Sequence, residues 1–141
     1  MVLETTYSSK EQKEIINQQV GKPFSFIEAV KLKGIGSKRM IIDKVSLNMN
    51  EYINKGVNFS YGNIELRPNG ILLYINKGLK TFTWVIPFYH LVIFNINGTS
   101  IHAHGKFVHF RNNKTHKENK IFFNRLLSLK VSFDRQYDFQ L

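Results

Sequence analysis

Short runs of β-branched and aromatic residues recur about every ten residues from Asn58 onward, and this repeat constrains the fold more than any other feature. Asn, Gly and Pro residues separate the runs. Apolar runs divided by turn residues are typical of antiparallel strands that follow one another through a sheet. We therefore expect six strands after Asn58. They are predicted at residues 61–66, 71–75, 81–86, 91–96, 101–104 and 107–110.

The strongest local signal is the Asn69-Gly70 pair between two of these runs. Asn-Gly favours a tight hairpin because both residues tolerate a positive φ angle. In the following run, apolar and polar residues alternate, so Phe82, Trp84 and Ile86 are expected to face the core. Pro87 is expected to end that strand, because proline has no backbone N–H to donate to a neighbouring strand.

An amphipathic helix is predicted after the last strand. Phe122, Leu126, Leu129 and Phe133 recur at helical spacing, which places them on one face. Thr115 is the predicted N-cap, with Glu118 three residues later in the capping-box position. Lys117, Lys120, Arg125 and Lys130 are expected on the solvent face. A strand meander leaves one end of its curved sheet open, and this helix is predicted to fill it.

The N-terminal part is predicted less sharply. A short helix is expected to begin at Ser8, with Glu11 completing a capping box, and to end at Gly21. Residues 24–30 fit either a strand or a helical turn. Within residues 40–53, the spacing of the apolar residues favours a helix before Asp43 and a strand after it.

Three segments resemble the pleckstrin-homology-like superfold, including its bacterial and GRAM-type members. Residues 62–74 are similar to the strand-turn-strand opening of that family, and 84–92 to its junction of Ile-Pro, a short polar loop and an apolar run. Residues 105–110 are similar to its last strand. The resemblance covers about residues 58–130 and implies a binding or assembly module. It implies no lipid-binding residue, because a basic first loop of the family's pattern is not identified.

The fold class expected is α+β and mainly β. It consists of a strongly bent antiparallel sheet, or a partly open barrel, of six to seven strands capped by the C-terminal helix, with a short N-terminal helix. Residues 1–56 are expected to form a helical and extended segment that packs on a β domain at 57–141, giving one structural unit. The seventh strand is expected at Val45 to Met49.

Charge indicates the class of partner. The net charge of the 141 residues is +10, and residues 52–130 contribute +9, because 11 Lys or Arg stand there against Glu65 and Glu118 alone. Such a field favours anionic partners. The expected anion-binding residues, which follow the basic turns and strand ends, are Lys33, Lys38, Arg39, Lys77, Lys80, Lys106 and Arg111.

His102 and His104 are the candidates for a metal site, because residues two apart on a strand project from the same face. A third ligand would have to come from His109, His90 or a carboxylate, and the region has almost no acids. Solvent-facing strand histidines are the more common explanation, so no metal and no cofactor is predicted. Without cysteine, disulfides and thiolate chemistry are excluded.

Residues 32–40 include a Gly34-Ile35-Gly36 turn followed by Lys38 and Arg39. This pattern resembles the glycine hairpin of helix-hairpin-helix modules, whose backbone amides approach DNA phosphates. A plain surface turn explains the same residues. Nucleic-acid binding through the Gly34 to Arg39 turn and the basic sheet therefore stays as an alternative function.

The leading hypothesis is a non-enzymatic binding module that holds a protein partner or a second copy of itself through a basic surface or a sheet edge. No carboxylate pair or activated nucleophile is apparent in the sequence. Nucleic-acid binding comes second, and weak association with anionic membranes third. The N-terminus lacks the pattern of a signal peptide, and the longest apolar stretch, 82–94, is too short to span a membrane. A cytoplasmic location is expected.

Overall fold

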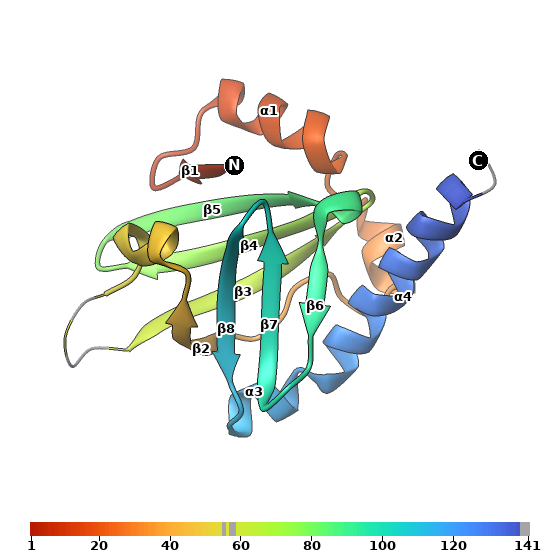
Figure 1. Ribbon diagram of the computed structural model, residues 1–141. Coiled ribbons are helices and arrows are strands. Elements are labelled where there is room, and N and C mark those ends of the chain that lie inside the picture. The colour runs from red at the N-terminus through yellow and green to blue at the C-terminus, as the bar shows by residue number, and fades with distance from the viewer. Residues whose placement is uncertain (55, 57–58, 139–141) are drawn as a thin grey trace.

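The computed structural model describes residues 1–54, 56 and 59–138, and it contains one antiparallel sheet with two edges (Figure 1). Eight strands occur in these ranges, in the order β1-β5-β4-β3-β2-β8-β7-β6. The protein is therefore α+β and mainly β, and the sheet is not closed. The expected domain boundary at 56 and 57 involves residue 57, which lies outside the described residues.

The elements follow one another along the chain as follows. The strands are β1 (Val2–Glu4), β2 (Met40–Val45), β3 (Ser60–Arg67), β4 (Gly70–Lys77), β5 (Lys80–Pro87), β6 (Val92–Phe94), β7 (Gly98–Ala103) and β8 (Lys106–Arg111). The α-helices are α1 (Lys10–Val20), α2 (Phe26–Lys31), α3 (Lys114–Glu118) and α4 (Lys120–Asp138). Two 3₁₀ helices are η1 (Leu47–Tyr52) and η2 (Phe88–His90). Among the described residues, no helix has both the length and the apolar character needed to cross a membrane.

The six strands expected after Asn58 are all present, and the β3–β4 hairpin is confirmed. Its turn is shifted by one residue, because Arg67 pairs with Gly70 and the loop consists of Pro68 and Asn69. Neither Asn69 nor Gly70 has a positive φ, so the expected Asn-Gly turn type is wrong. Proline favours the second position of a type I turn, which explains the shift.

The N-terminal strands depart from expectation. The prediction for residues 40–53 is wrong in both halves, because β2 precedes the 3₁₀ helix η1. β2 pairs with both β3 and β8, and this tertiary pairing overrides the helical spacing of its apolar residues. The seventh strand is thus Met40–Val45 and not Val45 to Met49. β1, which was not expected, pairs with β5 as the eighth strand.

The positions of the helix ends differ from the predicted ones because other residues act as caps. Ser9, not Ser8, caps α1, and its capping-box partner is Gln12 rather than Glu11. Gly21 ends α1 as predicted. Of the ambiguous residues 24–30, those from Phe26 onward form the helix α2, which Ser25 caps.

At the C-terminal end, Asn113 rather than Thr115 caps the helical region, since its Oδ1 accepts the His116 N–H. Asn119 separates α3 from α4. The expected helix is therefore two helices, of which the long second one bears the apolar stripe.

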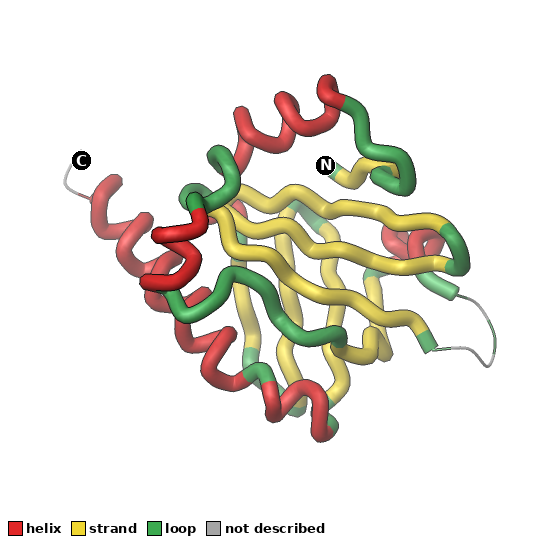
Figure 2. Tube along the Cα trace, turned by 180° about the vertical axis from the view of Figure 1, so that it is seen from behind, coloured by secondary structure: helices red, strands yellow, loops and turns green. Residues whose placement is uncertain are grey.

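The main core lies inside the bend of the sheet. In Figures 1 and 2, β3, β4 and β5 cross β6, β7 and β8 steeply, and α4 runs along the open side. Trp84 and Ile86 are fully buried there and Phe82 is partly buried, as their alternation predicts. Phe122 and Leu126 of α4 join the same core, so the helix fills the gap that the open sheet leaves.

A second, smaller core holds α1 against the opposite face of the sheet, where Ile16 and Val20 pack on Leu72 and Val85. A side chain at Gly70 would collide with the Ile86 carbonyl oxygen and Val20 Cγ1, so glycine is required where α1 meets the β3–β4 turn.

A buried arginine joins α1 to the sheet. Arg67 Nε donates to Glu65 Oε2 at 2.6 Å, and Arg67 Nη1 donates to Asn17 Oδ1 at 3.0 Å and to the Gly21 carbonyl at 2.9 Å. The Tyr74 hydroxyl donates to the other Glu65 oxygen, and burial, followed by the charge of Glu65, raises the pKa of Tyr74. Arg67 thus satisfies groups on two elements that are distant in sequence.

Replacing Arg67 with methionine is expected to lower the free energy of unfolding by about 3 kcal/mol, because Glu65 and the end of α1 lose their donor inside the protein. The matched control is Lys80→Met, which breaks the exposed pair with Glu4 (3.7 Å) and should cost less than about 1 kcal/mol. Urea denaturation measures both. Equal losses for the two variants would contradict the role given to Arg67.

Candidate functional site

The predicted anion-binding residues do not form one cluster. Lys33 follows α2, Lys38 and Arg39 precede β2, Lys77 and Lys80 flank the β4–β5 turn, and Lys106 and Arg111 occupy opposite ends of β8. Several are paired within the protein: Lys38 with Glu118, Lys80 with Glu4, and Arg111 with Asp43. Arg39 lies over the Tyr61 ring, and Lys77 Nζ donates to the Glu51 carbonyl. The predicted anion-binding residues are therefore spread over the surface and do not form one patch.

Three backbone amides of the Gly34 to Arg39 turn donate to oxygens within the protein. The Gly34 N–H donates to the Ala29 carbonyl, the Ser37 N–H to the Ile64 carbonyl, and the Lys38 N–H to Asn119 Oδ1. Gly36 forms an isolated bridge with Glu65 of β3. An amide that already donates to a protein oxygen is not free to bind a phosphate, so Gly34, Ser37 and Lys38 do not offer theirs.

The histidines predicted as metal candidates point to different neighbours. The His102 ring lies between Phe94 (4.9 Å between centroids) and Phe107 (5.1 Å), whereas the His104 ring lies 4.0 Å from that of His90. His109 is paired with Asp43 instead. Within the described residues, no group of three or more potential metal ligands occurs.

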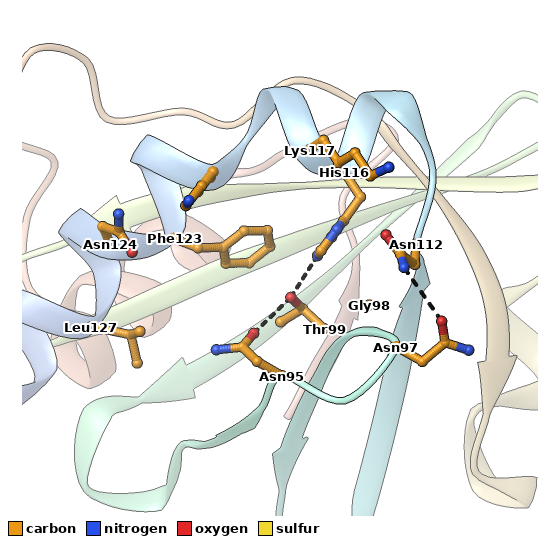
Figure 3. A pocket seen from close by; sticks show the side chains of 11 residues that line it. Asn95, Asn97, Gly98, Thr99, Asn112, His116, Lys117, Phe123, Asn124 and Leu127 are labelled. Atoms are coloured by element: carbon orange, nitrogen blue, oxygen red, sulfur yellow. Dashed lines mark hydrogen bonds between the residues drawn. The ribbon is translucent and has the colours of Figure 1, made fainter.

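A pocket of about 380 Å³ with a mixed polar and apolar lining lies where the β6–β7 turn meets the start of the C-terminal helices (Figure 3). The turn side contributes Asn95, Asn97 and Thr99. Asn97 and Gly98 have φ angles of 49° and 111°, and a side chain at Gly98 would collide with the Phe110 carbonyl oxygen. Glycine at this position therefore lets the turn close against the end of β8. Asn112, just after β8, donates to Asn97 Oδ1 at 3.4 Å.

The helix side of the pocket supplies positive charge and an apolar wall. Lys117 and Lys120 line it from α3 and α4, with Asn124 one turn further along α4. Phe123 and Leu127 form the apolar part of the lining. The lining contains no Asp or Glu, and neither lysine has an ion-pair partner among the described residues. The pocket thus combines cations and amide groups without any carboxylate.

His116 has a defined tautomer in this pocket. The Thr99 hydroxyl donates to Asn95 Oδ1 at 2.9 Å, so its oxygen is left to accept from His116 Nε2 at 2.7 Å. The proton of the neutral ring therefore lies on Nε2. Nδ1 is buried and has no hydrogen-bond partner in the described part of the chain. Burial, followed by the charge of His109, lowers the pKa of His116.

Sequence reasoning missed this pocket. It placed Lys117 and Lys120 on the solvent face of a helix, where both are indeed exposed. It placed Asn95 inside a strand and treated Asn97 only as a turn residue. The signal that could have found the site is the group of asparagines just before β7 and just after β8, at positions 95, 97 and 112. Their convergence with the lysines depends on where α3 and α4 pack.

The depressed pKa of His116 predicts a pH dependence of stability. The unfolded chain takes up this proton near pH 6.5, whereas the folded protein resists it, so the free energy of unfolding falls as the pH falls through 6.5 and below. His116→Gln removes this contribution. The stability difference between the parent protein and the variant should therefore be larger at about pH 8 than at about pH 5, by urea denaturation. The lowered pKa of His116 would be contradicted if the stability difference between the parent protein and the variant did not change with pH and if His116 titrated at or above pH 6.5 by NMR.

Comparison with known proteins supplies no counterpart for the pocket. No family model matches this chain, and neither a curated protein nor a solved structure matches it. The chemistry of the site is therefore inferred from its own residues.

Proposed function

We propose that this protein is a non-enzymatic binding module of pleckstrin-homology-like fold, which holds an acidic segment of a protein partner in the pocket between the β6–β7 turn and the C-terminal helices. The observation that carries the proposal is the lining itself. It contains several amide groups, no carboxylate, and two lysines that have no ion-pair partner within the described ranges.

The strand order supports the assignment of fold. The seven strands from β2 to β8 form a meander whose first strand pairs with its last, while β5 and β6 do not pair. α4 covers the open side with Phe122, Leu126 and Phe133. A bent sheet of this kind, in which β2 pairs with β8, β5 and β6 stay unpaired and a C-terminal helix fills the opening, agrees with a partly open pleckstrin-homology-like barrel.

The chemistry of the lining favours a carboxylate group. Lysine ammonium groups form charge-assisted hydrogen bonds with carboxylates, and the side-chain amides of Asn95, Asn97 and Asn124 can donate to the remaining lone pairs. Phe123 and Leu127 offer an apolar surface for the methylene groups of an acidic side chain. The volume of about 380 Å³ is near the lower end for ligand pockets, which suits one or two side chains.

The direction of the hydrogen bonds supports a binding role over catalysis. A histidine that activates a hydroxyl must accept its proton, but the Thr99 hydroxyl donates to Asn95 while His116 donates to Thr99. His116 therefore holds Thr99 in place and does not prepare it as a nucleophile. This arrangement fixes the turn against α3.

The proposal is tested with an acetylated and amidated hexaglutamate peptide as the probe, by isothermal titration and by NMR shifts of the asparagine side-chain amides. The double variant Lys117→Glu/Lys120→Glu should weaken binding at least about tenfold, because it replaces both cations of the pocket with repelling charges. The largest shifts in the parent protein should fall on Asn95, Asn97 and Asn124.

The matched control is Lys10→Glu/Lys13→Glu on α1, which changes the net charge by the same amount at exposed positions outside the pocket lining. It should weaken binding by less than about threefold. Equal weakening by both double variants would show a general charge effect and contradict the pocket. Tighter binding of single-stranded DNA or of anionic vesicles than of the peptide, with no shift at the three asparagines, would favour those partners instead.

A further inference from the structure

α2 presents its large apolar side chains to solvent. Phe26, Ile27 and Val30 are 84%, 67% and 60% exposed, and none of the six residues of this helix is buried. Single exposed apolar residues are common on proteins, but a group of large ones on one short helix indicates a surface that binds something. Figures 1 and 2 show α2 at the outer surface, beside α4.

The exposed group points away from the protein. In an α-helix, Phe26, Ile27 and Val30 lie on one face, whereas Ala29 and Leu32 lie toward the other side. Ala29 and Leu32 are half-buried, so the helix rests on that side. The apolar face is therefore a projection and not the wall of a groove.

The chain on either side holds α2 in this position. Phe24 before the helix and Ile35 after it pack against the main core. Ser25 caps the first turn, and Arg125 Nη1 of α4 donates to the Lys33 carbonyl at 2.7 Å. The apolar projection is thus a fixed part of the fold.

Lysines flank the apolar face. Lys22 precedes α2, Lys31 ends it and Lys33 follows it, and all three are exposed. None of the three forms an ion pair with any residue that the structure describes. The one acid of the helix, Glu28, accepts the Ser25 N–H at 3.1 Å. The surroundings of the apolar face are therefore mainly positive.

A hollow of about 420 Å³ beside α2 adds to this charge. Lys31 and Lys33 line it from one side, and Arg125 and Ser132 of α4 line it from the other. The described residues of its lining include no Asp or Glu. Ammonium and guanidinium groups form charge-assisted hydrogen bonds with phosphate oxygens. The hollow therefore suits the phosphate of a lipid headgroup.

From these observations we propose that α2 docks this protein on the surface of an anionic lipid bilayer. Phe26, Ile27 and Val30 insert between the lipids, and Lys31 and Lys33 contact their phosphates. The shape favours a bilayer over a protein partner, because an apolar projection flanked by cations matches anionic headgroups above an apolar interior. This role is additional to peptide binding in the pocket and does not rest on it.

The test is co-sedimentation of the full chain with vesicles of phosphatidylcholine and phosphatidylglycerol, mixed at about 3:1, and with vesicles of phosphatidylcholine alone. The parent protein should bind the anionic vesicles at least about tenfold more tightly than the neutral ones. Phe26→Ser/Ile27→Ser should weaken binding to the anionic vesicles at least about tenfold, because it removes two inserting side chains and leaves the charge unchanged.

The matched control is Leu47→Ser/Leu79→Ser, because these leucines are 89% and 98% exposed on η1 and at the β4–β5 turn. It should change binding to the anionic vesicles by less than about twofold. Equal losses in the two double variants would overturn the proposal. So would a parent protein that does not bind the anionic vesicles, or that binds both kinds equally, and a protein partner would then be the occupant of α2.

Insertion is measured separately with Phe26→Trp and brominated lipids in the anionic vesicles. Quenching of the new tryptophan is expected, whereas Trp84 is fully buried and should keep its emission. Binding without quenching would overturn the insertion of α2. Hexaglutamate binding by Phe26→Ser/Ile27→Ser should be unchanged, so failure of this proposal is distinct from failure of the pocket.

Discussion

The pairing of β2 with β8 is the contact on which the rest of the structure depends, because it joins the first strand of the seven-strand meander to its last. The register shifts between Ile42 and Lys44, and the side chain of the intervening Asp43 bonds His109 at 2.6 Å and approaches Arg111 at 3.8 Å. A bulge of this kind increases the local bend and twist of a sheet. Because the sheet is joined through β2 and β8, β5 and β6 do not pair, and α4 packs into the opening between them.

The pocket is a consequence of the same geometry. α3 follows β8 closely in sequence. The strand that pairs with β2 therefore also places His116 and Lys117 of α3 beside the β6–β7 turn. Asn119 then fixes the helices against the segment before β2, since it accepts from the Lys38 N–H and donates to the Lys38 carbonyl. Two segments that are distant in sequence thus hold the residues around the pocket in place.

Local pattern predicts the six strands after Asn58 and the apolar face of α4, because neighbours along the chain determine hairpins and helical faces. It fails at β2 and β1, whose partners lie far away in sequence and whose own residues fit more than one structure. The candidate site likewise combines features that local sequence shows with features that only distant contacts determine. Lys117 and Lys120 are visible as cations in the sequence, but only the packing of α3 and α4 on the β6–β7 turn separates them from the paired lysines elsewhere.

The surface divides into parts with different roles in the proposed function. If the proposed function holds, the scattered positive charges raise the rate of encounter with acidic partners and the pocket supplies the position-specific contacts.

The most direct test of this account is the set of NMR contacts between protons of β2 and β8 and between those of β5 and β6. The account predicts backbone contacts between Ile42 and Phe110, together with contacts from the His116 ring to Thr99 and Phe123, whose ring centroid lies 5.6 Å away. It predicts no backbone contact between β5 and β6. Contacts between β5 and β6, or none between Ile42 and Phe110, would contradict the open sheet and the pocket that depends on it.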